Sequence, residues 1–357
     1  MLAAVWHGRR DIRVEEFPDP PSPGKKEVKI RVEWAGICGT DLEEYCFGPL
    51  YIPVDRPNPI TGRKAPMILG HEFVGTVIEK GSAVTEFKIG DRVTPDTALF
   101  CGECYYCKRN LVHFCDKLAL LGLMTDGGFA QYVNAPTYMC YKLPANVAPE
   151  LGALAEPTAV AIRAVRIGGI KIGDRVAVLG AGIIGLLCQQ AAELAGAKEI
   201  YVIDREKNRL AVAKAQGATA IINPDKTDVV KAVKDLTDGL GADVVLEAGG
   251  NAITMALAPQ LCRKGGCAVI LGLHNEPVPI NLFPVVCGEI AIKGSFSHVY
   301  NEDYADAVAY LGAGRFHVDK LISARINLND MVEKGINELL NNKSKHLKIL
   351  VSPQNEA

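Results

Sequence analysis

The pattern of hydrophobic and polar positions changes near residue 155. Before that point, short apolar runs such as 28–32, 73–77 and 129–133 are separated by Gly and Pro. Short runs bounded by turn residues are typical of β-strands. We therefore expect an antiparallel β domain with long loops, and a surface loop in the Pro-rich stretch 49–66.

From residue 174 onward, apolar runs that suit buried strands alternate with segments of helical period. The predicted strands are 175–179, 199–203, 243–247, 267–271 and 290–294, and the clearest helices are 183–194 and 206–216. Such alternation predicts a parallel sheet with right-handed crossovers. The expected fold class is an α/β doubly wound parallel sheet beside a β domain.

Two domains of ordinary size suit a chain of 357 residues. We place the β domain at residues 1–155 and 296–357, because the chain returns to a mixed helix and strand pattern near its end. The doubly wound domain then covers residues 156–295.

The composition is that of a globular protein, with 48% hydrophobic and 22% charged residues. A net charge of −2 gives no general attraction to nucleic acid or to an anionic membrane. The longest apolar run, 176–188, is too short to span a bilayer, and residues 1–11 lack a signal-peptide pattern. Eleven cysteines without regular spacing favour a reduced, cytoplasmic protein over a disulfide framework.

Four of these cysteines, Cys101, Cys104, Cys107 and Cys115, lie within fifteen residues. Four thiolates this close in sequence form a tetrahedral cage for Zn²⁺. A closed four-cysteine site is structural, because no position remains for a substrate. Alone, this cluster would also suit a non-enzymatic zinc module that binds nucleic acid or protein.

A glycine motif, Gly180-Ala181-Gly182-Ile183-Ile184-Gly185, follows the first strand of the alternating region and opens a helix. Strand, glycines and helix together predict a dinucleotide-binding turn, with the pyrophosphate at the helix N-terminus. This motif argues against the non-enzymatic module.

The end of the next strand carries the residues that choose between NAD and NADP. Asp204, nineteen residues after Gly185, would accept hydrogen bonds from both ribose hydroxyls and would repel a 2′-phosphate. Arg205 is the opposing signal, and Arg209 is a further candidate contact. We give Asp204 the greater weight and expect NAD(H). Candidate contacts on the nicotinamide side are Glu247, Gly272, Leu273, Ser295 and Phe296, which lie at or after later strand ends.

A second metal site is suggested more weakly by Cys38, His71, Glu72 and Glu156. One thiolate, one imidazole and one carboxylate would bind zinc and leave a position open. Each residue alone is more simply interpreted as a buried or hydrogen-bonded structural residue. Neighbouring residues such as His71 and Glu72 also point in different directions on a strand or a helix.

Taken in order, five motifs resemble the zinc-containing medium-chain dehydrogenases: 38–41, 70–72, the four-cysteine cluster, 156–157 and the glycine motif. Within that family the chain is most similar to the polyol branch, on residues 6–11, 46–53, 61–66 and 122–128. The resemblance implies a GroES-like first domain, a Rossmann second domain, two zinc ions per chain and a catalytic zinc in the cleft between the domains.

The resemblance also implies an activity and its residues. We expect NAD-dependent interconversion of a secondary alcohol or vicinal diol and its ketone, foremost (R,R)-2,3-butanediol and acetoin. Cys38, His71 and one glutamate would bind the catalytic zinc; whether this is Glu72 or Glu156 stays open, and the other would act through water. Thr40 would pass the proton toward solvent.

Three points stay open beside that expectation. Relatives often have His where this chain has Glu43, so a proton relay through that position would differ. Sorbitol-type polyol dehydrogenases and L-threonine 3-dehydrogenases remain alternatives, because a few pocket residues decide the substrate. A homo-oligomer, dimer or tetramer, is expected from the resemblance.

Overall fold

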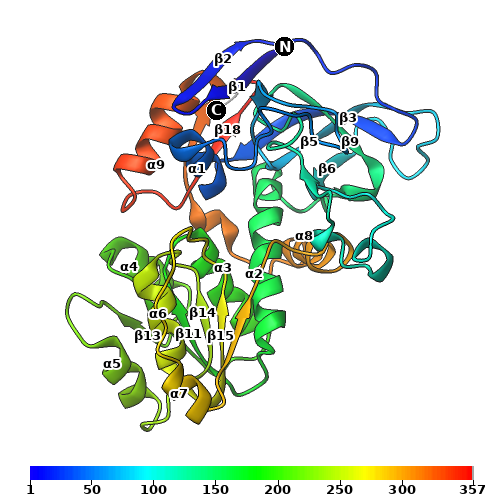
Figure 1. Ribbon diagram of the computed structural model, residues 1–357. Coiled ribbons are helices and arrows are strands. Elements are labelled where there is room, and N and C mark those ends of the chain that lie inside the picture. Colours follow the sequence, from blue (N-terminus) through cyan, green and yellow to red (C-terminus); the bar gives the residue numbers. More distant parts are fainter. Residues whose placement is uncertain (356–357) are drawn as a thin grey trace. The chain divides into compact units, whose positions relative to one another are not determined.

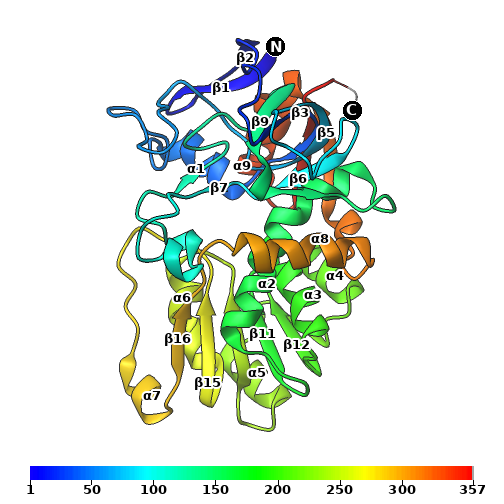
Figure 2. The same ribbon diagram turned by 90° about the vertical axis from the view of Figure 1, so that its right-hand side faces the viewer.

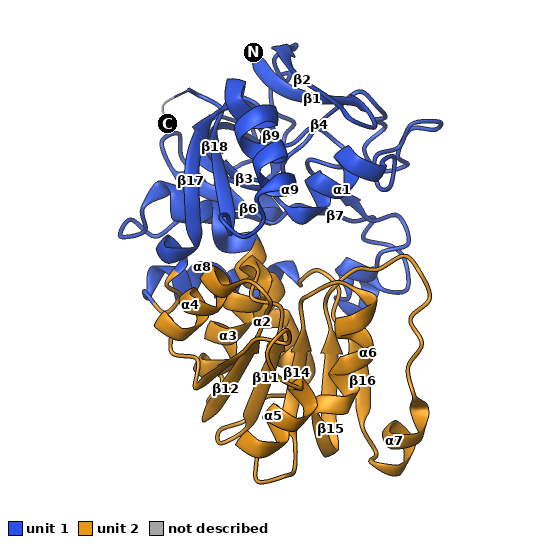
Figure 3. Cartoon of the chain, turned by 90° about the vertical axis from the view of Figure 1, so that its left-hand side faces the viewer, with its two compact units in different colours: residues 1–156, 299–314, 318–357 blue, residues 157–298, 315–317 orange. Residues whose placement is uncertain are grey.

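The computed structural model describes residues 1–355, which form two compact units (Figure 3). Unit 1 comprises residues 1–156, 299–314 and 318 onward, and unit 2 comprises residues 157–298 and 315–317. No helix in the described range is both long enough and apolar enough to cross a bilayer.

Unit 1 is built mainly from antiparallel sheet (Figure 1). A small sheet has the order β2-β1-β4, and a larger one has the order β10-β6-β5-β3-β18-β17, with β9 also paired to β3. In the larger sheet β17 and β18 pair in parallel. The strands are β1 (Leu2–Gly8), β2 (Asp11–Glu16), β3 (Glu27–Gly36), β4 (Met67–Ile68), β5 (Glu72–Lys80), β6 (Arg92–Pro95), β7 (Ala98–Leu99), β8 (Ala119–Leu120), β9 (Tyr132–Pro136), β10 (Cys140–Lys142), β17 (Ile322–Asn327) and β18 (Lys348–Ser352).

The helices of unit 1 are short and lie outside these sheets. They are α1 (Gly39–Phe47), α8 (Ala305–Gly312) and α9 (Asn337–Asn341), and α2 (Ala155–Gly168) begins here and continues into unit 2. Alternate residues of β3 are buried, as expected for a strand with one face on the core. The core includes Trp6, Ile30, Phe73 and Phe129, all at most 1% exposed.

One predicted strand of unit 1 is displaced. The run 129–133 was expected to be a strand, but β9 begins at Tyr132. Phe129 instead accepts a bond from the backbone N–H of Ala4 in β1 (2.8 Å) and donates to the O atom of Leu69, which follows β4 (2.9 Å).

Unit 2 is a six-stranded parallel sheet with the order β13-β12-β11-β14-β15-β16 (Figure 2). Its strands are β11 (Arg175–Leu179), β12 (Glu199–Ile203), β13 (Ala220–Ile222), β14 (Ala242–Glu247), β15 (Cys262–Ile270) and β16 (Ala291–Gly294). Its helices are α3 (Ile183–Leu194), α4 (Lys207–Ala215), α5 (Val229–Leu236), α6 (Ala252–Leu261) and α7 (Leu282–Cys287).

The strand order of unit 2 reverses at its centre. From β11 the chain adds β12 and β13 on one side, then crosses back to add β14, β15 and β16 on the other. Helices α3 and α4 pack on β11–β13, whereas α6 packs on β14 and β15 with α5 beside it. Ligands of doubly wound sheets bind at the carboxyl ends of the strands where the order reverses. Here that point lies between β11 and β14.

Candidate metal and cofactor sites

The four clustered cysteines come together in a lobe of short turns in unit 1. Two 3₁₀ turns, Cys107–Arg109 and Val112–Phe114, fold the segment back so that all four sulfur atoms lie within 4.8 Å of one another. The Sγ atoms of Cys101 and Cys107 are 3.9 Å apart, and those of Cys101 and Cys115 are 3.6 Å apart. None of these cysteines forms a disulfide in the described chain.

These separations suit a tetrahedral zinc site. With Zn–S bonds of about 2.3 Å, tetrahedral geometry places sulfur atoms about 3.8 Å apart. Backbone N–H groups of Cys101 and Cys107 donate to the sulfur atoms of Cys115 and Cys104, both at 3.4 Å. Backbone N–H groups, that of Cys107 foremost, lower the pKa of Cys104 to about 6, which favours a thiolate.

A second group of ligand atoms forms where β3 and β5 pair. Gly36 at the end of β3 is opposite Glu72 at the start of β5. This register brings Cys38, at the N-cap of α1, close to His71. The ligand atoms of Cys38, His71 and Glu72 lie within 4.8 Å of one another, and His71 and Glu72 are buried. Strand pairing therefore brings together residues that are far apart in sequence.

Asp41 holds the backbone of one member of this group and faces another. Its Oδ2 atom accepts a hydrogen bond from Cys38 N (2.8 Å), and its Oδ1 atom lies 3.6 Å from His71 Nδ1. Asp41 is fully buried, and burial raises its pKa to about 6. Because Nδ1 of His71 faces Asp41, the other ring nitrogen is left for a metal.

Lys348 is a site residue that sequence reasoning missed. It begins β18, which pairs with β3 through Leu350 and Gly36. Its Nζ donates to both carboxylate oxygens of Glu72 (2.9 and 2.6 Å) and to Ile37 O (2.9 Å). The one available signal was a lysine in an otherwise apolar run, 348–351, since every residue of β18 is buried.

The remaining predicted catalytic residues differ in their surroundings. Thr40 Oγ1 lies 3.8 Å from Cys38 Sγ. Glu156 lies outside the group within 4.8 Å, but its charge is among those that raise the pKa of His71 against the opposing effect of burial. Glu43 is partly buried, and burial, followed by the charge of Glu44, raises its pKa.

In unit 2, the glycine motif forms the turn between β11 and α3. Gly180 has a φ of +95°, which favours glycine. A Cβ atom at Gly185 would lie 1.8 Å from Gly180 O, so only glycine allows this close approach of helix and strand. Ile183 and Ile184 form the first turn of α3, and the N–H groups of a first helical turn can donate to an anionic ligand.

Acidic and basic side chains surround this turn. Asp204 accepts hydrogen bonds from Ala181 N (2.6 Å) and Glu206 N (2.8 Å), which places its carboxylate against the glycine turn. Arg205 is engaged by Asp225 at 3.1 Å. Arg209 lies beside the turn, since a Cβ atom at Gly182 would be 3.8 Å from its Nη1 atom.

The predicted contacts on the nicotinamide side lie at the ends of three other strands. Leu273 and Phe296 are 50% and 44% exposed, so their side chains are accessible. Ser295 donates its backbone N–H to Ile270 O (2.9 Å). Glu247 is fully buried, and Gly272 donates its backbone N–H to Glu247 O (3.2 Å). Glu247 thus lies behind the surface, whereas Gly272 is partly exposed.

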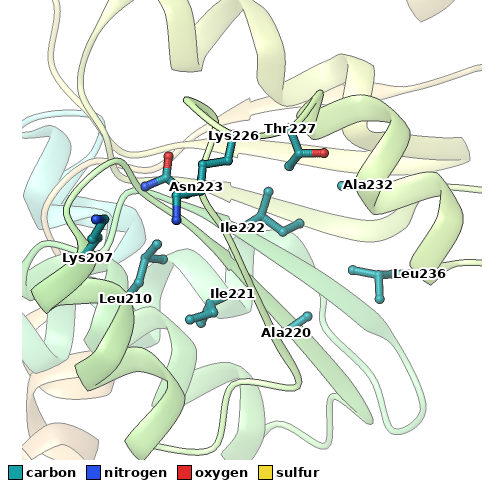
Figure 4. A pocket seen from close by; sticks show the side chains of 10 residues that line it. All are labelled: Lys207, Leu210, Ala220, Ile221, Ile222, Asn223, Lys226, Thr227, Ala232 and Leu236. Carbon is teal, nitrogen blue, oxygen red and sulfur yellow. The ribbon is translucent and has the colours of Figure 1, made fainter.

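A separate hollow of about 530 Å³ lies at the β13 edge of the sheet (Figure 4). Figure 4 shows Ile221 of β13 between Leu210 of α4 and Leu236 of α5, with Lys207 and Lys226 nearby. No predicted site residue lines the hollow in the described chain. It contains no thiol, imidazole or carboxylate, and the metal-ligand groups lie elsewhere.

Comparison with known proteins agrees with both parts of this description. Residues 24–145 match the family model for the alcohol dehydrogenase GroES-like domain, and residues 184–312 match that for zinc-binding dehydrogenase. The chain is 40% identical over 356 residues to (R,R)-butanediol dehydrogenase of Bacillus subtilis, a match that covers 99% of this chain and 100% of the relative. The chain belongs to the zinc-binding dehydrogenases.

Two further similarities place it within these dehydrogenases. It is 34% identical to sorbitol dehydrogenase of Bacillus subtilis, over 99% of this chain and 97% of that protein. The crystal structure of 2R,3R-butanediol dehydrogenase from Bacillus subtilis superposes with a TM-score of 0.92 at 37% identity, over 99% of both chains. The predicted fold class, a GroES-like domain with a Rossmann domain, is confirmed. The expectation of an oxidoreductase that acts on CH–OH groups is also confirmed, and the non-enzymatic zinc module is excluded.

Proposed function

We propose that this zinc-binding dehydrogenase interconverts (R,R)-2,3-butanediol and acetoin with NAD(H) as its cofactor. The buried group of Cys38, His71 and Glu72 carries this proposal, because its thiolate, imidazole and carboxylate are the ligand types of a catalytic zinc site. Full-length similarity to butanediol dehydrogenases supports the diol as substrate.

The donor set suits zinc, and each residue has a role in the proposal. Cys38, His71 and Glu72 would hold the ion. Asp41 would orient His71, which it faces. Lys348 would neutralise part of the negative charge that the thiolate and carboxylate ligands bring. Zinc at this site would polarise the substrate oxygen, and the nicotinamide would exchange the hydride. Glu156 would act from outside the ligand group.

In this proposal, side chains of the protein carry the proton of the substrate hydroxyl toward solvent. Thr40 lies beside Cys38 and carries a hydroxyl that both accepts and donates, so it can move the proton from the substrate oxygen toward solvent. Glu43, on the same helix, is partly buried and is the next group able to take part. We propose Thr40 as the first member of this path.

The cofactor preference follows from Asp204. Its carboxylate lies at the glycine turn, where it would accept from ribose hydroxyls and repel a 2′-phosphate. Arg205 is paired with Asp225 and is therefore less available to a phosphate. We propose NAD(H), with Gly180, Gly182, Gly185 and the N-terminus of α3 around the pyrophosphate.

An NADH-linked assay tests the function directly. Purified protein would be given acetoin, fructose, 2-butanone and 2-amino-3-oxobutanoate, and the chirality of the diol product would be determined. Acetoin reduction to the (R,R)-diol as the fastest reaction supports the proposal. Faster turnover of fructose would favour the sorbitol-type alternative, which the sorbitol dehydrogenase relative supports, and would refute the butanediol assignment.

We further propose a homo-oligomer formed through β16 and α7. All four residues of β16 are exposed, and in the described chain this strand ends the sheet. The neighbouring α7 exposes Leu282, Phe283 and Val286 at 59%, 75% and 72%. An exposed edge strand has unpaired backbone groups that can pair with the same strand of a second copy in a symmetric interface. A monomer by light scattering would refute this arrangement.

We also propose a cytoplasmic location, which eleven cysteines without disulfide bonds support.

A further inference from the structure

Glu247 is a buried acid whose carboxylate binds its own loop. It ends β14 and is 0% exposed. Its Oε1 atom accepts three hydrogen bonds, from Gly249 N (2.9 Å), Gly250 N (2.9 Å) and Thr254 Oγ1 (2.6 Å). Burying a carboxylate is costly unless hydrogen bonds compensate it. These three donors stabilise the carboxylate, and the carboxylate in turn fixes the turn 248–250.

The other carboxylate oxygen of Glu247 lies where the loop after β14 packs closely on the loop after β15. Glu247 Oε2 is buried and has no hydrogen-bond partner. A Cβ atom at Gly272 would lie 2.8 Å from this oxygen and 2.3 Å from the Cα atom of Gly250. Gly272 is therefore required for a close approach of two loops, which explains this residue without a cofactor contact.

The same turn also meets the glycine motif. A Cβ atom at Gly180 would lie 2.9 Å from Gly249 N and 3.0 Å from Ala248 C. Three loops at the carboxyl edge, those that follow β11, β14 and β15, thus pack backbone against backbone. They do so where the strand order reverses, which is where a dinucleotide binds.

We propose that Glu247 is a positioning residue for the dinucleotide: it holds the turn 248–250 as a rigid wall of the binding crevice at the β11–β14 reversal. Its carboxylate acts through the backbone of that turn and does not contact the cofactor. This inference rests on the NAD(H) site proposed above. Because the turn is already ordered before the cofactor binds, less conformational entropy is lost on binding, and the affinity for the cofactor is higher.

The test is NADH affinity measured by fluorescence titration of the full-length protein, without any turnover. Glu247→Ala removes all three hydrogen bonds and should raise the Kd for NADH at least about tenfold, which corresponds to ~1.4 kcal/mol. Glu247→Gln keeps an acceptor oxygen and should restore most of the affinity. Thr254→Val removes a single bond and should have an effect between those of the two. In the ligand-free protein, the amides of Gly249 and Gly250 should exchange faster in Glu247→Ala than in the wild type.

Asp243 provides a matched control at the other end of β14. Its Oδ2 accepts from Arg175 N (2.7 Å), so Asp243→Asn also weakens a bond between a β14 acid and a backbone N–H. It should leave the Kd for NADH unchanged even if it lowers the melting temperature.

Unchanged NADH affinity in folded Glu247→Ala, or an equal loss in Asp243→Asn, would overturn the inference alone. If Glu247→Ala fails to fold, unaltered NADH affinity in Thr254→Val would overturn it. Failure of the wild type to bind NADH would remove the proposed function and the inference with it.

Discussion

Replacing Lys348 by methionine removes one member of a buried ion pair and keeps most of the apolar side-chain volume. The side chains of Lys348 and Glu72 are 2% and 1% exposed. In the variant, both carboxylate oxygens of Glu72 lose the same donor, and Ile37 O loses its partner. Glu72 would then be a buried carboxylate without the ammonium group that donates to both of its oxygens.

The expected cost follows from these contacts. Removing one partner of a buried ion pair destabilises a protein by about 3–5 kcal/mol. The unpartnered carbonyl of Ile37 adds about 1 kcal/mol. We expect a loss of about 4–6 kcal/mol in metal-free protein. Zinc at Cys38, His71 and Glu72 would replace the missing positive charge, so the loss should fall by roughly half when zinc is bound.

The assay is urea unfolding of wild type and Lys348→Met, each with excess zinc and after treatment with a chelator. Chelation also empties the cysteine lobe, but it does so in both proteins, so the difference between them reports on Lys348. Because linkage is reciprocal, Lys348→Met should also bind zinc more tightly than the wild type in a competition with the chelator.

A double-mutant cycle checks the pairing itself. Glu72→Gln leaves Lys348 unpaired, and the double variant removes both charges. The double variant should lose clearly less stability than the two single losses added together. Additive losses, or a cost below about 1 kcal/mol for Lys348→Met without metal, would refute the reasoning.

Three further predictions concern the metal and cofactor residues. Cys104→Ser should lower the zinc content from two ions per chain to one and reduce stability while NADH affinity is kept; normal stability with lost turnover would refute a structural role. His71→Ala should abolish turnover and lose the other zinc, yet remain folded and bind NADH with wild-type Kd. Asp204→Gly should shift the ratio of kcat/KM toward NADP by about tenfold or more. An unchanged ratio would contradict the role given to Asp204.

Much of unit 2 could be predicted from sequence because its signals are local. The predicted bounds of β11, α3 and β12 agree with the structure, since central parallel strands are apolar on both faces and glycines mark their ends. Predictions were poorer where strands are partly exposed. β15 begins at Cys262, five residues before the predicted start, because Lys264 and Gly265 are exposed and interrupt the apolar pattern.

The two candidate metal sites differed in predictability for a related reason. The cysteine lobe draws all four ligands from one short segment, so their spacing shows the site. The second group depends on β3, β5 and β18, and the pairing of these strands cannot be predicted from local sequence patterns. Lys348 acts on Glu72 across 276 residues, and no spacing rule connects them. The family resemblance supplied the ligand candidates but not this lysine.

The same contrast bears on how each site depends on its metal. The cysteines of the lobe are brought together by short turns, and their sulfur atoms lie within 4.8 Å of one another. Zinc would bind all four as thiolates at such distances, so we expect the fold of that segment to depend on the ion. At the second group the ligands lie on paired strands, Asp41 faces His71, and Lys348 already compensates Glu72. We therefore expect that group to keep its geometry when zinc is removed and to bind the ion in a preformed cage. The site that is easier to find in the sequence is thus the one whose structure depends more on its metal.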